Sequence, residues 1–293
     1  MKKLIITLDV DNDFIREPLE KEQSLQWDGL KVGMPEILLA IDGLALRLNT
    51  QIAVTIFCRA DWQIEAVMGE VSWVFKKTQD VLKSLDLKNI QIGLEWHPHL
   101  YEKQNGKWAL SVNKYAQEKQ LLDIYAKLNN AGFDVKCSRI GECFFSPTIL
   151  KTLNAIGIIF DSTAFSGRDI GHTNWTNTPT YPYKPSLEDF TTHGDSKLFE
   201  IPFTMIPIKA PYDQIKTLRY FNLIFDTFFT KEGIKNHHGP AIVTILHPYE
   251  ILTLGNENTH QLFGNISSIT ENIKLIYQLQ PIQSILLRDY DEN

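Results

Sequence analysis

The chain has 293 residues, of which 43% are hydrophobic and 22% charged, and its formal net charge is −6. This is the composition of a globular protein, and it excludes disorder for most of the chain. The sequence contains no basic stripe of the kind that binds nucleic acid, so nucleic acid is not expected as a partner.

The cysteines and the apolar segments bear on the compartment. The three cysteines, Cys58, Cys137 and Cys143, are an odd number, which argues against a disulfide framework and predicts unpaired thiols in a reducing environment. The N-terminal apolar run covers only residues 4–8 before Asp9, too short for a signal peptide. No uncharged stretch of about 18 residues suggests a transmembrane segment. We therefore expect a cytoplasmic protein without a membrane span.

Strand patterns and helix patterns alternate along the chain. Strands are predicted at 3–8, 51–57, 90–96, 133–138, 158–161, 199–208, 241–246 and 282–287. Helices are predicted at 36–48, 63–86, 113–131, from Ser146-Pro147 to about Gly157, at 212–231 and at 267–279. This alternation predicts an α/β fold with a parallel sheet and right-handed crossovers, closed or nearly closed into a barrel. We expect a single domain over residues 1–293.

The regular pattern stops between residues 166 and 197. This segment is rich in Gly, Thr, Asn, Pro and aromatic residues. Irregular segments of this length inside compact domains are usually functional, so we expect a substrate loop. Trp175 and Tyr181 could stack on a substrate there, and core packing is the alternative interpretation.

Charged or imidazole side chains follow six of the predicted strands. They are Asp9 and Asp11, Arg59 and Asp61, Glu95 with His97 and His99, Arg139, Asp161, and His247. In folds built on a parallel sheet, ligands bind at the carboxyl ends of the strands. These side chains are therefore the candidates for an active site.

Two pairs of these residues have the spacing of a metal site. Asp9 and Asp11 are two positions apart, as are His97 and His99, so in extended backbone each pair projects to one face. A solvated turn and structural histidines are the alternatives. An aspartate with two histidines is a typical ligand set for zinc or another divalent ion.

Two other strand-end residues suit acid–base chemistry. His247 follows a very apolar strand, and its position opposite the Asp/His group favours a general acid over a structural histidine. Arg139 could orient a carboxylate, bind a substrate anion or form a structural salt bridge.

Five segments, in order over roughly residues 3–250, resemble the motifs of the polysaccharide deacetylase superfamily (NodB homology, carbohydrate esterase 4). The segments are ITLDVDND, EWHPHLY, SRIGECFFSPTILKTLNAIGIIFDST, EIPFT and ILHPYE. The second motif of the family is usually H-x-x-x-H, whereas this chain has His97 and His99. The resemblance implies an irregular NodB-like barrel of about seven strands.

The resemblance also implies roles for individual residues. Asp9 would be the catalytic base, Asp11 a metal ligand, His247 the catalytic acid and Arg139 the partner of Asp9. With the strand-end pairs, this predicts that Asp11, His97 and His99 bind one divalent metal ion, with zinc as the first candidate. Glu95 remains an alternative ligand. The resemblance further points to Asp161 at the substrate, and Trp62 and Trp96 could stack on a sugar ring.

The function expected from this resemblance is metal-dependent hydrolysis. Metal-activated water would remove an acetyl or formyl group from an N-acyl sugar or sugar conjugate, either a small molecule or a lipid-linked sugar. The alternatives are hydrolysis of another linear or cyclic amide C–N bond, and a catalytically inactive carbohydrate-binding homologue.

Overall fold

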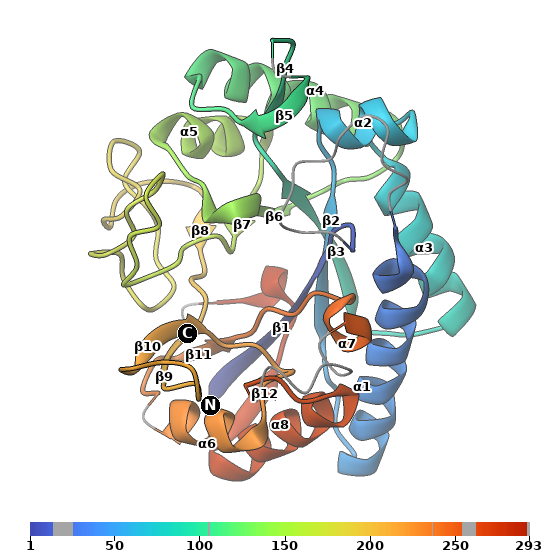
Figure 1. Cartoon of the computed structure of the whole chain (residues 1–293), viewed down its shortest axis with the longest axis vertical. Coiled ribbons are helices and arrows are strands. Elements are labelled where there is room, and N and C mark those ends of the chain that lie inside the picture. Colours follow the sequence, from blue (N-terminus) through green and yellow to red (C-terminus); the bar gives the residue numbers. More distant parts are fainter. Residues whose placement is uncertain (14–25, 105, 236, 254–261, 292–293) are drawn as a thin grey trace.

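A curled parallel sheet forms the centre of the molecule. The computed structural model describes residues 1–13, 26–104, 106–235, 237–253 and 262–291. Seven parallel strands are arranged in the order β11-β1-β2-β3-β6-β7-β8 as a half-barrel, and β12 also pairs with β1 (Figure 1). The irregular (β/α) barrel expected from the sequence is therefore confirmed.

The strands of this sheet are short except at its centre. They are β1 (Lys2–Val10), β2 (Val54–Arg59), β3 (Ile90–Trp96), β6 (Cys137–Ile140), β7 (Phe160–Asp161), β8 (Phe199–Glu200), β11 (Ala241–Val243) and β12 (Ile282–Ser284). Seven of the nine residues of β1 are buried, because helices cover the outer face of the sheet and the barrel interior covers the other. Asp9 pairs with Phe57 of β2, and Glu95 of β3 pairs with Arg139 of β6, so these strand ends share one edge.

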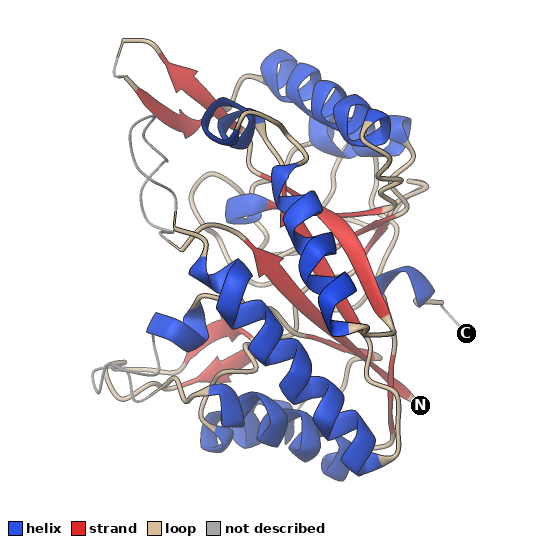
Figure 2. Ribbon diagram, turned by 90° about the vertical axis from the view of Figure 1, so that its right-hand side faces the viewer, coloured by secondary structure: helices blue, strands red, loops and turns tan. Residues whose placement is uncertain are grey.

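Eight α-helices are described. They are α1 (Met34–Leu48), α2 (Trp62–Met68), α3 (Trp73–Leu85), α4 (Lys114–Asn130), α5 (Pro147–Ile156), α6 (Thr227–Lys235), α7 (Glu250–Thr253) and α8 (Ile266–Leu279). Shorter turns are η1 (Gly29–Gly33), η2 (Gly141–Cys143) and η3 (Leu287–Asp289). In Figure 1, α1 and α3 lie along one side of the sheet and α6 and α8 below it, and the turned view in Figure 2 shows helices in front of the strands.

The caps of α5 follow the signals in its sequence. Ser146 accepts a hydrogen bond from the backbone N–H of Ile149 at 3.3 Å, and Pro147 takes the first helical position. Gly157 ends the helix in the left-handed region with φ 83°.

Three predicted elements were wrong in extent. The helix expected over 63–86 is divided into α2 and α3, because Gly69 ends α2 with φ 86°. The strand expected over 199–208 is divided into β8 and β9 (Met205–Ile208), on either side of Pro202, which cannot donate a ladder hydrogen bond.

The helix expected over 212–231 was also wrong. Residues Thr217–Tyr220 form β10, which pairs antiparallel with β9, and α6 begins only at Thr227. Pairing with β9 outweighed the local helical pattern. A hairpin of β4 (His99–Glu102) and β5 (Lys107–Leu110) was not predicted at all.

The thiol prediction agrees with the structure, in which Cys58, Cys137 and Cys143 are unpaired. Within the described residues, no helix has both the length and the apolar character needed to cross a bilayer.

Candidate active site and metal centre

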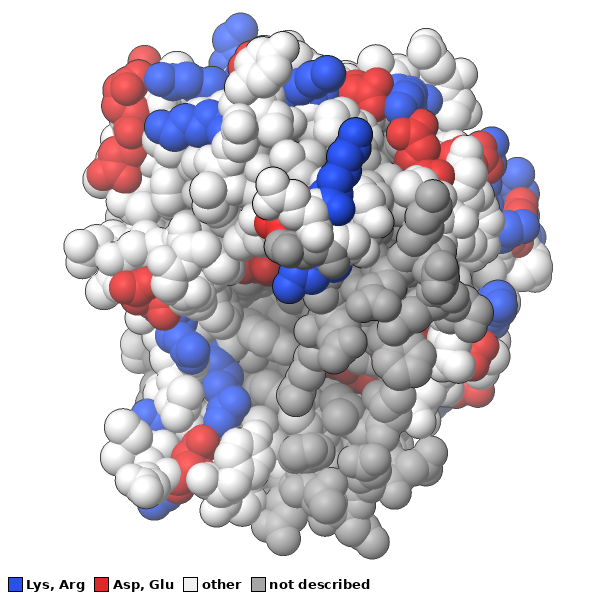
Figure 3. All heavy atoms as spheres, turned by 45° about the horizontal axis from the view of Figure 1, so that its top comes forward, with Lys and Arg blue, Asp and Glu red and all other residues white. Residues whose placement is uncertain are grey.

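A pocket of about 650 Å³ opens at the carboxyl ends of the parallel strands. Asp9 from β1, Arg59 from β2, Glu95 from β3 and Arg139 from β6 all line it, and His247 follows β11. The parallel topology therefore brings together side chains that are far apart in the sequence. On the face turned forward in Figure 3, the described Lys and Arg side chains lie among Asp and Glu side chains.

Arg139 and Asp9 form a buried ion pair. Nη1 of Arg139 donates a hydrogen bond to Oδ1 of Asp9, and the two residues are each 2% exposed. Nε and Nη2 of Arg139 donate to the carbonyl and hydroxyl oxygens of Ser162, at 2.7 and 3.0 Å. The rings of Phe57 and Phe203 lie 4.4 and 4.6 Å from the guanidinium carbon. These contacts hold Arg139 rigidly, and through it the Asp9 carboxylate.

A second carboxylate supports His247. Nδ1 of His247 lies 3.5 Å from Oε1 of Glu250, and Oε2 of Glu250 accepts the backbone N–H of His247 at 3.0 Å. The side-chain amide of Asn222 donates to both oxygens of Glu250. Burial acts to lower the pKa of His247, but Glu250, with Asp9 and Glu95 farther away, outweighs it and raises this pKa to about 9. His247 is therefore protonated at neutral pH.

The first of two groups with metal-binding donors contains Asp11, Glu95 and His97. Nε2 of His97 lies 3.1 Å from Oε1 of Glu95 and 3.6 Å from Oδ2 of Asp11. Oδ1 of Asp11 accepts hydrogen bonds from Nη1 of Arg59 and the backbone N–H of Asn12, both at 2.7 Å. Burial raises the pKa of Asp11, but Arg59 and His97 outweigh it and lower this pKa to about 2.

The protonation states in this group follow from burial. Burial and the nearby carboxylates of Asp9 and Asp11 raise the pKa of Glu95 well above its usual value. Burial and the charge of Arg59 lower the pKa of His97, which favours the neutral imidazole that binds metals.

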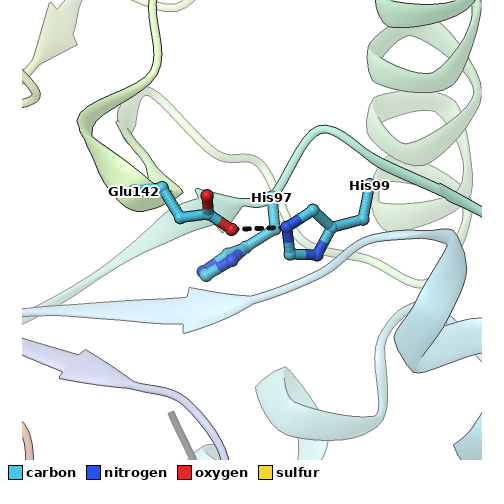
Figure 4. A group of neighbouring side chains, drawn as sticks. All are labelled: His97, His99 and Glu142. Carbon is cyan, nitrogen blue, oxygen red and sulfur yellow. Dashed lines mark hydrogen bonds and ion pairs between the residues drawn. The ribbon is translucent and has the colours of Figure 1, made fainter. Parts of the chain in front are cut away.

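The second group contains His97, His99 and Glu142 (Figure 4). The two imidazole rings are 5.5 Å apart, and Nε2 of His99 lies 2.5 Å from Oε1 of Glu142. Burial raises the pKa of Glu142, but the hydrogen bond and charge of His99 outweigh it and lower this pKa to about 2. Gly141 makes this packing possible, because a Cβ there would lie 2.3 Å from Nε2 of His97.

The residues fit a divalent metal ion. Buried imidazoles and carboxylates supply its usual donors, and Oε2 of Glu95 is buried without a hydrogen-bond partner among the described residues. The expected ligands Asp11, His97 and His99 all line the pocket. His97 belongs to both groups, whereas Asp11 and His99 belong to one each. Sequence reasoning missed Glu142, whose only signal was its place directly after Arg139-Ile140-Gly141.

The five residues expected to contact substrate do not line the pocket. Trp96 and Trp175 have no exposed surface. The indole N–H of Trp175 donates to the carbonyl oxygen of Cys143 at 2.9 Å, and its ring packs against Phe145 and Phe190. Core packing, the alternative interpretation, describes both tryptophans, so we correct the expectation that they stack on a sugar.

The other three residues have partners elsewhere. The indole N–H of Trp62 donates to Asp123 at 2.7 Å. Tyr181 is 47% exposed but lies outside the pocket lining. Asp161 is fully buried and accepts a hydrogen bond from Ser138. Its burial corrects the expected substrate contact of Asp161, whereas contacts of Trp62 and Tyr181 with substrate stay predictions.

Other aromatic side chains line the pocket instead. They are Trp108, which belongs to β5, Tyr220, which belongs to β10, and Phe165 and Phe203, which lie outside the strands and helices. The hairpin brings Trp108 to the pocket and β10 brings Tyr220, whereas Phe165 and Phe203 reach it from segments between strands. No short-range sequence signal distinguished them from core aromatic residues.

No protein-family model and no curated protein sequence matches the chain. A solved structure from Mycobacterium smegmatis, assigned as a polysaccharide deacetylase, is 15% identical and has a TM-score of 0.57, over 98% of this chain and 87% of that one. A Bordetella bronchiseptica protein, assigned as a polysaccharide deacetylase involved in O-antigen biosynthesis, is 12% identical over 94% and 90% of the chains, with a TM-score of 0.44. A branching enzyme from Thermococcus kodakaraensis is 11% identical over 100% and 72%, with a TM-score of 0.49. The likeness to the first of these structures shows that the chain shares the fold of that protein.

Proposed function

We propose that this chain hydrolyses the amide of an N-acyl sugar or sugar conjugate, releasing an acetyl or formyl group, with a divalent metal ion at the pocket. One observation carries the proposal. The Asp9–Arg139 pair and the Glu250-supported His247 line one pocket together with buried imidazole and carboxylate donors. A base, an acid and metal ligands in one cavity are the parts that amide hydrolysis requires.

The metal ion is proposed to bind near His97. Asp11, His97 and His99 remain the proposed ligands, Glu95 adjoins them, and zinc is the first candidate for these donors. Such an ion supplies polarisation of the amide carbonyl and a lowered pKa for bound water.

Asp9 is the proposed general base. Arg139 engages Oδ1 of Asp9, so Oδ2 is the oxygen proposed to take the proton from the attacking water. Arg139 thereby acts as a positioning residue, which keeps the carboxylate oriented toward the pocket.

His247 is the proposed general acid. Its pKa of about 9 keeps a proton on the ring at neutral pH. That proton passes to the amide nitrogen as the C–N bond breaks, which yields a free amine and a carboxylic acid.

The aromatic wall suits a sugar ring. Trp108, Phe165 and Tyr220 offer apolar faces beside polar groups, the usual lining of a small-molecule site. A small-molecule or lipid-linked N-acyl sugar is the proposed substrate. The proposed location is the cytoplasm, in keeping with three unpaired thiols, and a single domain over residues 1–293 is the proposed organisation.

The test is a substrate screen with zinc-loaded protein. Free N-acetyl and N-formyl sugars, their nucleotide-linked forms and lipid-linked forms are incubated with the protein, and the released amine is measured. We expect amine release by the wild type and its loss in Asp9→Asn. Release from a non-sugar amide alone would favour the alternative C–N hydrolase. Binding of a sugar without any amine release would favour an inactive carbohydrate-binding protein.

A further inference from the structure

We propose that Glu142 is a further metal ligand of this chain, which joins the imidazoles of His97 and His99 in addition to the proposed ligand Asp11. The inference rests on the metal-dependent hydrolysis proposed above. It goes beyond that proposal because it names a ligand from η2, which follows β6 and supplies none of the ligands expected from the sequence.

The turn after β6 carries Glu142 to the imidazoles. Gly141 packs directly on the ring of His97, where a Cβ would lie 2.3 Å from Nε2, so a larger residue would push the turn away. Glu142 follows at once, with φ 58° and ψ 15°. Its Oε1 lies 2.5 Å from Nε2 of His99. Figure 4 shows this carboxylate directed at the His99 ring, with the His97 ring beside both.

The three side chains offer donors within reach of one ion. One ligand atom from each of His97, His99 and Glu142 lies within 4.8 Å of the other two. Each histidine is 7% exposed, so both imidazoles are held in place by their surroundings. Nδ1 of His99 lies 3.4 Å from Oε1 of Gln63, an outer contact that orients the ring with Nε2 toward Glu142.

Glu95 provides an independent indication of a ligand at this place. Glu95 is 3% exposed, and its Oε1 lies 3.1 Å from Nε2 of His97. Oε2 is buried and has no hydrogen-bond partner among the described residues. A buried polar atom without a partner calls for a water molecule or an ion, and the same carboxylate contacts an imidazole of the proposed set through its other oxygen.

The surroundings of Asp11 and Glu142 differ in charge. Nη1 of Arg59 lies 2.7 Å from Oδ1 of Asp11, so Oδ2, which lies 3.6 Å from Nε2 of His97, is the oxygen of Asp11 left for an ion. Glu142 instead pairs with His99, which is neutral when it binds a metal. Two histidines and a glutamate are a known set of zinc ligands, so a glutamate is a suitable partner for the two imidazoles.

The experiment measures metal affinity without using turnover. Metal-free wild type, Glu142→Gln and Glu65→Gln are titrated with zinc in competition with a chromophoric chelator, and the visible spectrum of each cobalt(II) complex is recorded. Glu65 is a matched control, because its side chain is 35% exposed against 40% for Glu142 and is ion-paired to Lys127. We expect Glu142→Gln to weaken zinc binding by roughly tenfold or more and to change the cobalt spectrum. Glu65→Gln should leave both unchanged.

A second variant separates coordination from a merely structural role. Glu142→His replaces the carboxylate oxygen by an imidazole nitrogen, so it should bind zinc more tightly than Glu142→Gln, with its own cobalt spectrum. Thermal melting of each metal-free variant confirms that it is folded. Wild-type zinc affinity and an unchanged cobalt spectrum in Glu142→Gln would overturn the inference, as would a wild type that binds neither ion.

The two proposals fail in different ways. If zinc binding depends on Glu142 but no amine is released from any substrate, Glu142 is supported as a metal ligand and the proposed hydrolase activity is contradicted. If amine release depends on zinc but Glu142→Gln leaves the zinc affinity unchanged, the hydrolase activity is supported and Glu142 is not a ligand.

Discussion

The strand ends and the long segment 166–197 both looked functional in the sequence, but the structure uses them differently. Asp9, Glu95 and Arg139 come from three separate strands and meet in one pocket. The long segment instead buries its largest ring, Trp175, and leaves Tyr181 outside the pocket. Neighbouring parallel strands end at the same edge of a sheet, so their last side chains lie close together independently of the loop conformations. An irregular segment has no such constraint, and its aromatic residues serve the core as readily as a ligand.

Removing the proposed acid or base at the strand ends should have the strongest effect on activity. Asp9→Asn and His247→Ala should each lower kcat by roughly 10² to 10⁴, because each group moves one proton in the reaction. Zinc content, measured by elemental analysis, should survive in both because neither is a proposed ligand.

The matched control is Asp134→Asn, at an exposed carboxylate that does not line the pocket, which should leave kcat unchanged. Asp11→Ala should lose metal and activity together. Full activity in Asp9→Asn or His247→Ala would remove that residue from the mechanism. Loss of zinc in Asp9→Asn would mean that the roles of the two aspartates are exchanged.

Substitutions of buried residues in the long segment should lower the stability of the fold. Trp175→Ala should lower the free energy of unfolding by about 3–5 kcal/mol, because a fully buried indole leaves a cavity between Phe145 and Phe190. Tyr181→Ala, at a 47% exposed position, should change it by less than about 0.5 kcal/mol. Urea unfolding measures both. Normal stability in Trp175→Ala would show that this part of the segment does not pack as described.

The pH profile tests whether Glu250 sets the charge of His247. The pKa of His247 is raised from 6.5 to about 9, so kcat should fall as the pH rises through about 9 and the acid loses its proton. Because the folded-state pKa is raised, the same pair stabilises the fold fully below about pH 6.5 and loses this contribution as the pH rises toward 9.

Glu250→Gln removes the carboxylate while keeping a similar shape. Burial then lowers the pKa of His247, so the alkaline limb of kcat should move down by roughly 1–3 pH units. Glu188→Gln, at an exposed ion pair with Lys151, is the control and should not move it. An identical alkaline limb in wild type and Glu250→Gln would assign that limb to another group.

The smallest effect on activity is expected from the aromatic side chains that line the pocket. Trp108→Ala should raise KM by about tenfold with less change in kcat, because it removes apolar contact that ground state and transition state share. The comparison variant is Tyr115→Ala, at an exposed tyrosine outside the pocket lining, which should leave KM unchanged. Steady-state kinetics on the substrate found in the screen would decide this, and an unchanged KM in Trp108→Ala would place the sugar elsewhere.

Much of the fold could be predicted because its signals are local. The buried run of β1, the strand at 90–96 and the caps of α5 each depend on a few neighbouring residues, and each was predicted within a few positions. The error at 212–231 had a different origin. Residues Thr217–Tyr220 take their conformation from pairing with β9, a long-range contact that local periodicity does not report.

The alternation of strands and helices could be predicted from local sequence patterns. Because parallel strands end at one side of a sheet, the same patterns predicted that Asp9, His97, Arg139 and His247 lie at a common edge. Which of these groups contact one another follows from the packing of distant segments. Arg139 meets Asp9, Arg59 meets Asp11, and the turn at Gly141 sets a carboxylate against His99. Such contacts depend on register, turn geometry and side-chain packing between distant segments, and no spacing along the chain encodes them.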